Sequence, residues 1–289
     1  MSARQVFKRC TGLAVVIGSA LIFLGASVGS AAQQGVPSAD AAPSLSAEQI
    51  VDIVASPDRS EADRINDKRR MPAQMLAFIG VRPGMVVLDL SAGGGYTTEL
   101  LARSVGPTGR VYGQSAPRIV RTPPTAPEGA AVPVAASAPA SAAARQTLAT
   151  RAANPLAGNI VAVVQPFEAP VPPELAAGGL DLVTLMFNYH DLGHMGVDRT
   201  RMNRAVFAAL KPGGLYVIAD HSGRPGTGIS EAGTLHRIEE AFLREEVEQA
   251  GFKLRDVGNF MRNPSDPRDR NTPEPPQPKD EFVLKFVKP

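Results

Sequence analysis

The sequence predicts an α/β fold, doubly wound, with a mostly parallel sheet of seven strands that ends in an antiparallel hairpin. Short apolar runs typical of buried strands alternate with helix-period patterns along most of the chain. The last two apolar runs are separated by an irregular stretch instead of a helix, which indicates a hairpin. Because such sheets bind ligands outside the carboxyl ends of their strands, functional residues are expected there.

Length and charge limit the class of protein. A chain of 289 residues with 44% hydrophobic side chains can bury one sizeable core, so we expect one globular domain with appendages. The formal net charge of +2 includes three basic residues within residues 1–32, and without that segment it becomes 2 − 3 = −1. The remaining chain has no electrostatic footprint for nucleic acid, so no nucleic-acid partner is expected.

The first 32 residues have the parts of a secretory signal peptide. Arg4, Lys8 and Arg9 precede the apolar run Leu13–Leu24, and small residues follow as far as Ala32. We expect residues 1–32 to be cleaved off and the rest of the chain to be exported, without stable membrane contact.

The alternative for this segment is an uncleaved helix that anchors the chain in the inner membrane. Residues 11–32 carry no charge and are about long enough to span a bilayer. The single cysteine, Cys10, lies in residues 1–32, so an exported chain would have no disulfide and no thiolate ligand. Residues 33–45 are small, polar and proline-containing, which is typical of a linker.

The domain is expected to span residues 46–289. Ser46 and Gln49 resemble a capping box at the start of a helix with an apolar face around Ile50. Residues 56–72 alternate charges of both signs, and the general expectation is a solvated helix surface. The continuous apolar run Met85–Leu90 then predicts a strand that is buried on both faces.

A second short strand is expected at Arg110–Gln114, after which the composition changes. Residues 116–157 are mostly Ala, Pro, Ser and Thr without a sustained apolar period. We expect a disordered insertion, with a short helix around Ser141–Thr150 as its one regular element, and no part in the chemistry.

Alternation of strands and helices returns after the insertion. Strands are expected at Ile160–Val164, Leu180–Phe187, Leu215–Ala219, Phe252–Val257 and Phe282–Val287. Helices are expected at Arg201–Leu210 and in a long amphipathic stretch with Leu235, Ile238, Ala241, Phe242 and Val247 on its apolar side.

Val87–Leu101, VLDLSAGGGYTTELL, reads as a strand, a glycine-rich turn and the start of a helix. Glycines there let the backbone turn tightly and let a ligand approach, while free helix N–H groups face it. The run lacks the third glycine of a dinucleotide fingerprint, because position 98 is Thr. It also lacks the Lys-Ser/Thr pair of a phosphate-binding P-loop.

The combination of Asp89, the glycines and the Lys-Pro-Gly-Gly turn at residues 211–214 resembles the class I S-adenosylmethionine-dependent methyltransferases. Five stretches are similar to a group of bacterial predicted methyltransferases with signal peptides: DRSEADRINDKRRMPAQMLAFIGVRPGMVVLDL, NYHDL, LKPGGLYVIADHSGRPG, NPSDPRDR and FVLKFVKP. This resemblance covers residues about 46–115 and 158–289. It implies a Rossmann-like fold, methyl transfer to a small molecule, and location in the bacterial periplasm.

The resemblance also implies where the cofactor binds. The turn that follows the first strand is expected to hold S-adenosylmethionine, with the residues Asp89, Ser91, Gly93, Gly94, Gly95, Tyr96 and Thr97. Gln114 stands where most such enzymes place an acid on the ribose hydroxyls, and Gln165 where an acid often meets the adenine amino group. Phe167 is expected over the adenine face, and Asn188 in the same pocket.

The chain has four histidines, all in its last hundred residues: His190, His194, His221 and His236. A neutral imidazole can remove the proton of a methyl acceptor near pH 7. We expect His190 to be this base, oriented by Asp191 or Asp220, with His221 beside it. The substrate is expected to contact Arg70, Tyr189 and Arg224. Arg70 belongs to the charged segment near Arg59, Asp63 and Asp67, which recurs in the similar group and is expected to border the site.

Two alternatives use the same residues differently. The first is an exported methyltransferase fold that binds a ligand without catalysis. The second is a metal-dependent enzyme, because His190-Asp191-x-x-His194 spaces two imidazoles four residues apart and Asp220 or His221 could complete a zinc or iron site. The spacing is not the HExxH signature, so the favoured assignment includes no metal ligand.

Overall fold

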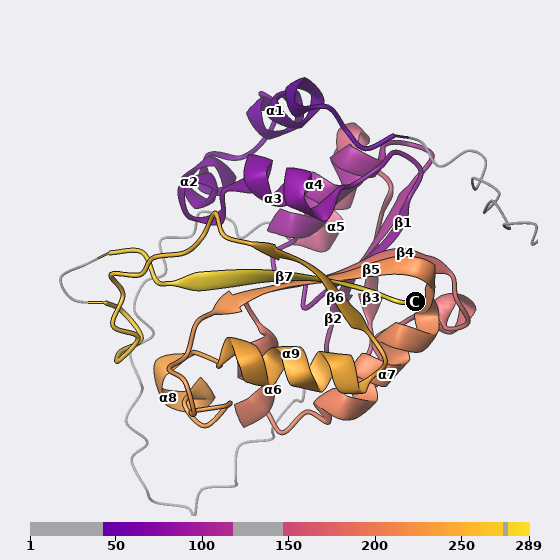
Figure 1. The fold of residues 1–289 in the computed structure, drawn as a ribbon. Helices are drawn as coiled ribbons and strands as arrows, with labels where there is room; N and C mark the ends of the chain where they lie inside the picture. The colour runs from indigo at the N-terminus through magenta and orange to yellow at the C-terminus, as the bar shows by residue number, and fades with distance from the viewer. Residues whose placement is uncertain (1–42, 118–146, 274–276) are drawn as a thin grey trace, which may run out of the picture. The chain divides into compact units, whose positions relative to one another are not determined.

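Seven strands form one sheet in the order β3-β2-β1-β4-β5-β7-β6 (Figure 1). The first five are parallel, and β7 runs antiparallel to both β5 and β6. The predicted fold class, with seven strands and an antiparallel pair at the C-terminus, is confirmed. The strands are β1 (Val86–Leu90), β2 (Arg110–Ser115), β3 (Ile160–Val164), β4 (Leu180–Met186), β5 (Leu210–His221), β6 (Lys253–Gly258) and β7 (Glu281–Val287).

This computed structural model describes residues 43–117, 147–273 and 277–289, all within the compact unit Asp40–Pro289. The expected signal peptide, most of the linker and residues 118–146 of the expected insertion lie outside the described residues. Within the described ranges, no helix combines the length and the apolar character that a membrane crossing requires.

Alternate side chains of each central strand enter two different cores. Val87 of β1 and Leu182 of β4 pack on one face with α1 (Ala47–Ala55), α3 (Pro72–Ile79) and α4 (Tyr96–Val105). Their neighbours Leu88 and Val183 pack on the other face, with α7 (Arg199–Ala209) and α9 (Glu240–Gln249). Figure 1 shows these two groups of helices on opposite faces of the sheet. Burial on both faces explains why the central strands read as continuous apolar runs.

The first helix begins as predicted. The Ser46 side chain accepts a hydrogen bond from Gln49 N, and the Gln49 side chain accepts one from Ser46 N, which is the predicted capping box. The charged segment forms α2 (Glu61–Arg70). Met71, with a φ of 47°, then separates α2 from α3, so two helices meet at a sharp corner beside the sheet.

The predicted long helix around residues 235–247 is wrong in its first half. The structure has α8 (Ala232–Leu235) and α9, with an extended break between them. Ile238, expected on the helix, instead pairs with Ser222 at the end of β5, and its N–H donates to His221 O at 3.0 Å. Burial of Ile238 against the sheet end therefore outweighs continuation of the helix.

The end of the predicted insertion is also ordered. Residues 147–157 form α5 (Leu148–Ala152) and the 3₁₀ helix η1 (Pro155–Ala157). Leu148 packs in the core beside Gly95 and Gly113. The short helix expected around Ser141–Thr150 overlaps α5 at Leu148–Thr150. The prediction of disorder is wrong for the rest of residues 147–157, because Arg151 pairs with Glu99 of α4 and Leu148 packs beside Gly95. The remaining short elements are η2 (Pro173–Leu175) and α6 (Tyr189–His194).

Candidate functional site

A cavity of about 720 Å³ opens at the carboxyl ends of β1 and β4. Its wall combines the turn after β1, one side of α2, the residues that follow β4, and Arg151. The strand order reverses between β1 and β4. Sheets of this kind bind ligands at such a switch point. The expected site residues that line the cavity are Arg70, Asp89, Ser91, Gly93, Gly94, Tyr96, Thr97 and Asn188.

The turn after β1 bends sharply because three of its residues adopt left-handed backbone conformations: Ser91 (φ 55°), Gly93 (φ 56°) and Gly95 (φ 80°). Gly95 is buried and faces α5, not the cavity, and a Cβ there would lie 2.8 Å from side-chain atoms of Arg151 and Leu148. Gly94 is exposed on the cavity wall. Of the three glycines expected at the ligand, Gly93 and Gly94 therefore line the cavity and Gly95 does not.

Asp89 closes β1 at the base of the cavity. Its carboxylate accepts hydrogen bonds from Thr98 Oγ1 at 2.6 Å and Thr184 Oγ1 at 2.8 Å. Burial raises its pKa to about 6, although the two hydroxyl donors and the positive charge of Arg70 oppose that rise. A carboxyl group that holds negative charge at neutral pH thus stands next to the glycine turn.

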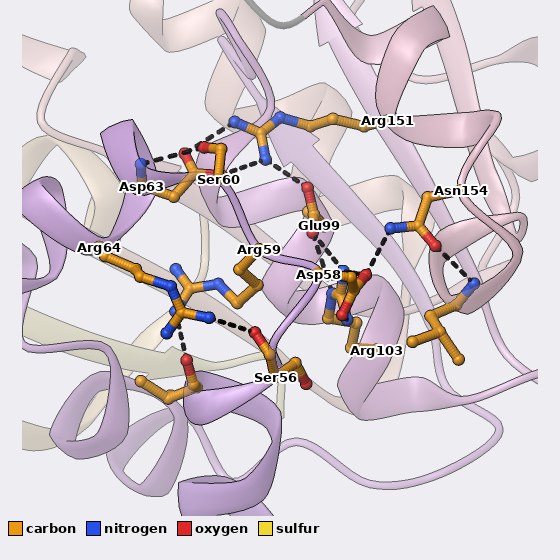
Figure 2. Close-up of polar contacts among 12 residues, drawn as sticks. Ser56, Asp58, Arg59, Ser60, Asp63, Arg64, Glu99, Arg103, Arg151 and Asn154 are labelled. Atoms are coloured by element: carbon orange, nitrogen blue, oxygen red, sulfur yellow. Dashed lines mark hydrogen bonds and ion pairs between the residues drawn. The ribbon is translucent and has the colours of Figure 1, made fainter.

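The charged segment of residues 56–72 borders the cavity, as expected from its recurrence in the similar group. Arg59 binds both carboxylate oxygens of Asp67 at 2.8 Å, and Tyr96 Oη donates to Asp67 Oδ1 at 2.6 Å. The Arg103 guanidinium joins Asp58 to Glu99 (Figure 2). The Tyr96–Asp67 hydrogen bond joins α4 to α2, and the Arg103–Asp58 pair joins α4 to the loop before α2, so the segment is fixed against α4 and is not only a solvated surface.

Arg151 is a site residue that the sequence did not indicate. Its guanidinium binds Asp63 of α2 and Glu99 of α4 (Figure 2). Its Nε donates to Gly94 O at 2.6 Å. All three charged side chains are buried. Arg151 is the only charged residue in residues 147–157, and this contrast is the single signal that could have drawn attention to it.

Arg70 faces the cavity without an anionic partner. Its guanidinium lies 4.1 Å from the ring centroid of Phe187, and no described residue forms a hydrogen bond or ion pair with it. Burial and the neighbouring Arg69 lower its pKa to about 10, so it remains charged at neutral pH. A charged guanidinium with free donors in a cavity can bind a carboxylate or phosphate.

Besides Gly95, three expected cofactor contacts do not line the cavity: Gln114, Gln165 and Phe167. Gln114 is fully buried: its Oε1 accepts from Ser91 N at 2.9 Å and its Nε2 donates to Gln165 O at 2.6 Å. Both ends of its amide thus brace the glycine turn and the end of β3. Gln165 contributes its backbone to this bond, and Phe167 is buried in the core. The expectation that Gln114 lines the ligand cavity is wrong, because both ends of its buried amide are engaged in these bonds.

Two expected substrate contacts also lie elsewhere. Tyr189 is fully buried, where its hydroxyl hydrogen-bonds Glu246 at 3.0 Å and accepts from Asn203 Nδ2 at 2.8 Å. Arg224 is half-exposed and pairs with Glu231. Neither residue lines the cavity, so Tyr189 packs the core and Arg224 forms a loop ion pair.

The expected base His190 does not line the cavity. Its Nδ1 lies 2.6 Å from Asp220 Oδ1, and its Nε2 lies 3.2 Å from Asp191 Oδ1. Burial lowers its pKa, but the hydrogen bond and charge of Asp220 outweigh burial, and the net pKa is raised. Asp191 also lies 2.9 Å from His236 Nδ1 and 3.8 Å from His194 Nδ1. We call His190, Asp191, His194 and His236 the histidine cluster.

The histidine cluster adjoins the cavity through Asn188. The side chain of Asn188 accepts from Ser91 Oγ at 2.6 Å and donates to Asp191 Oδ2 at 2.9 Å. Ser91 belongs to the cavity wall, so a single amide connects the wall to the cluster. Sequence reasoning brought His190, Asp191 and His194 together but did not place His236 with them.

His221 is separate from the histidine cluster. Its Nδ1 lies 2.8 Å from Glu281 Oε1. Nevertheless, His221 Nδ1 forms no hydrogen bond with any described residue. Burial lowers the pKa of His221 to about 3 and raises the pKa of Glu281 to about 7. We therefore interpret the pair as a largely neutral contact. His221 packs against Phe187, with ring centroids 5.6 Å apart, and does not line the cavity.

Comparison with known proteins gives one family match. The model of the protein-L-isoaspartate(D-aspartate) O-methyltransferase family matches residues 54–121. This stretch contains α2, α3, β1, the glycine turn and α4, which together form most of the cavity wall. A comparison with curated protein sequences found no match.

Solved structures share the fold. A SAM-dependent methyltransferase from Aquifex aeolicus is 16% identical, with a TM-score of 0.50, over 85% of this chain and 100% of its own. A chain of the complex between the Haloferax volcanii Trm112 methyltransferase activator and a methyltransferase is 18% identical, with a TM-score of 0.51 and the same coverage. The [4+2]-cyclase SpnF is 14% identical, with a TM-score of 0.50, over 76% of this chain and 82% of its own. The chain thus has the Rossmann-like fold of S-adenosylmethionine-dependent methyltransferases, a fold that also carries other chemistry.

Proposed function

We propose that this protein is an S-adenosylmethionine-dependent methyltransferase that acts on a small molecule. The observation that carries the proposal is the cavity at the switch point, where the glycine turn faces the unpaired guanidinium of Arg70. The fold and the family match over residues 54–121 support it. The cavity volume of about 720 Å³ is in the ordinary range for sites that bind small molecules.

The residues on the wall fit the parts of this cofactor. Arg70 would hold its carboxylate, and Asp89 together with the turn would hold its ammonium group, because their charges are complementary. Gly93 and Gly94 present backbone without a Cβ, so a ligand can approach closely. When bound, S-adenosylmethionine supplies a methyl group on a positively charged sulfur, which an acceptor atom can attack.

The chain's own contribution is to position the two reactants and to exclude water. The ion pairs of α2, α4 and Arg151 hold the wall rigid behind the cofactor. His190 is not assigned the role of a free base, because both ring nitrogens face carboxylates. We place the acceptor on the side of Phe187 and Asn188, where the cavity meets the histidine cluster.

Binding of the cofactor can be tested by calorimetric titration of the full chain with S-adenosylmethionine and S-adenosylhomocysteine. We expect micromolar affinity, at least a tenfold loss in Arg70→Ala, and no measurable binding in Gly94→Asp, which adds negative charge to the wall. Arg224→Ala is the matched control, because Arg224 does not line the cavity, and should bind as the wild type does. Absence of binding at millimolar ligand, with circular dichroism of a folded protein, would refute the proposal.

We also propose that the domain is exported after cleavage behind Ala32. The support is the charge and hydropathy pattern of residues 1–32, which lie outside the described residues. Mass spectrometry of the periplasmic fraction of a bacterial host should find a protein that begins at Gln33. Recovery of the intact chain in the membrane fraction would favour the anchored alternative.

A further inference from the structure

We propose that the histidine cluster is a binding site for a divalent transition metal, with His190, Asp191 and His236 as ligands. The ligand atoms of these three residues lie within 4.8 Å of one another. Two imidazole nitrogens and one carboxylate oxygen are a ligand set that zinc and iron accept in proteins. The proposal concerns metal binding alone and does not depend on methyl transfer.

Two neighbours orient the proposed ligands from behind. Asp220 is fully buried, and its carboxylate lies 2.6 Å from His190 Nδ1 and accepts a hydrogen bond from His190 N at 2.8 Å. These two contacts hold the ring with Nε2 towards Asp191. Asn188 Nδ2 donates to Asp191 Oδ2 at 2.9 Å, which leaves Oδ1 directed at the imidazoles. A carboxylate on the second nitrogen of a histidine is the usual support of a metal ligand.

The backbone brings His236 to the other ligands. His190 and Asp191 lie on α6, whereas His236 follows α8 in a left-handed conformation with a φ of 51°. α6 and its neighbours approach closely because of two glycines. A Cβ on Gly193 would lie 2.5 Å from the Ile229 side chain, and one on Gly233 would lie 3.4 Å from His194 Cβ. A left-handed histidine costs free energy, and a ligand role would account for its position.

The site has an entry path and an open position. The side chain of His236 is 41% exposed and that of Asp191 is 25% exposed, so an ion can reach both from solvent. Three protein ligands leave the fourth tetrahedral position of zinc free, as in catalytic zinc sites. His194 Nδ1 lies 3.8 Å from Asp191 Oδ1 and its side chain is 43% exposed, so it is a neighbour of the site and not one of the three proposed ligands.

The competing explanation is a carboxylate that merely accepts hydrogen bonds from the surrounding imidazoles. It requires protonated ring nitrogens directed at Asp191, whereas a metal requires their lone pairs. The two explanations therefore differ in whether Zn²⁺ binds with a stoichiometry of one and whether that binding needs His236.

The test is a calorimetric titration of the untagged, EDTA-treated full chain with Zn²⁺. The visible absorption spectrum of the Co²⁺-loaded protein is a second readout. We expect one ion per chain, micromolar affinity or better, and a visible Co²⁺ spectrum of low coordination number. His236→Asn should weaken Zn²⁺ binding at least 100-fold, because asparagine tolerates the left-handed conformation but provides no imidazole. His194→Ala should weaken it less than tenfold, and Glu174→Gln, an exposed carboxylate on η2, should leave it unchanged.

Absence of stoichiometric Zn²⁺ binding at 1 mM, or equal binding by folded His236→Asn and wild type, would overturn the proposal. The same samples titrated with S-adenosylmethionine separate the two claims. Wild-type protein that binds S-adenosylmethionine but not Zn²⁺ would refute only the metal site, and wild-type protein that binds Zn²⁺ but not S-adenosylmethionine would refute only the methyltransferase assignment.

Discussion

Arg151 and Asp63, 88 positions apart in the sequence, are joined by two hydrogen bonds of 2.8 and 2.9 Å between guanidinium and carboxylate. The pair ties the end of the expected insertion to the charged helix α2, and the same guanidinium reaches Glu99 and the backbone of Gly94. One buried cation thus connects three segments around the cavity. Figure 2 shows the convergence of these side chains from separate elements.

Arg151→Ala should destabilise the fold by about 3 kcal/mol, because it leaves the carboxylates of Asp63 and Glu99 buried without their partner. Urea unfolding followed by circular dichroism measures this change. Arg244→Ala removes a half-exposed guanidinium from an i,i+4 pair with Glu248 and should change stability by only ~0.5 kcal/mol. Equal stability losses in both variants would mean that the Arg151 cluster does not hold the wall.

Gly95→Ala and Gly94→Ala should differ in stability although the two positions are adjacent. At Gly95 the new Cβ would lie 2.8 Å from Arg151 and Leu148 in a left-handed backbone, and we expect a loss of roughly 2 kcal/mol. Gly94 is exposed and is not among the residues with positive φ, so its substitution should cost far less. Thermal unfolding of the two variants is the measurement, and a greater loss at Gly94 would contradict the conformation of the turn.

The raised pKa of Asp89 predicts a specific pH dependence. Its folded pKa of about 6 lies above the ordinary value of 3.8, so the folded state binds a proton more readily than the unfolded state. The free energy of unfolding should therefore rise as the pH falls through 6, and this gain should be lost again at higher pH.

Comparison with Asp89→Asn isolates this effect from other groups, such as His221, whose lowered pKa acts in the opposite direction. Between pH 8 and pH 5, wild type should gain ~1 kcal/mol of unfolding free energy relative to Asp89→Asn. Urea unfolding of both proteins at the two pH values provides the numbers. Parallel pH profiles would show that Asp89 has an ordinary pKa in the folded state.

Tyr189→Phe should affect stability but not ligand binding. The substitution removes a buried hydroxyl that bonds Glu246 and Asn203, and it leaves those groups without that partner. We expect a loss of about 1–2 kcal/mol and unchanged affinity for S-adenosylmethionine. A clear affinity loss in a fully stable variant would return Tyr189 to the substrate site.

Asn188→Ala should weaken both proposed ligands, because its amide bonds Ser91 on one side and Asp191 on the other. We expect a tenfold or greater loss of Zn²⁺ affinity, since Asn188 orients a proposed metal ligand, and a smaller loss for S-adenosylmethionine. Arg70→Ala, which is outside the histidine cluster, should weaken S-adenosylmethionine only. If Asn188→Ala altered neither affinity, the cavity and the cluster would be independent.

Much of the fold is encoded in local patterns that can be recognised from sequence. The apolar runs at Met85–Leu90 and Leu180–Phe187 indicate strands, observed at Val86–Leu90 and Leu180–Met186, and the glycines after Asp89 indicate a tight turn. The capping box at Ser46 likewise depends on neighbours within three residues. The sheet order and the cavity position follow from such elements because doubly wound sheets have few workable connections.

The breaks in these patterns were harder to predict. The apolar spacing of Leu235, Ile238 and Phe242 fits a helix, but Ile238 gains burial by pairing with the end of β5. That gain depends on a strand far away in the sequence. The short helix expected around Ser141–Thr150 overlaps α5 only at Leu148–Thr150, and its packing was not predicted, since Leu148 is stabilised by contact with Gly95 and Gly113, not by its own sequence neighbours.

The sequence by itself determined the strands, the glycine turn and the position of His190 and Asp191 after a strand end, because these depend on periodicity and on the direction of the chain. Only the tertiary structure decided which side chains face one another. It buried Gln114 behind the turn, placed Arg151 against Asp63, and brought His236 to Asp191. Such contacts join residues tens of positions apart, and their geometry is set by the packing of whole elements, which no local pattern records.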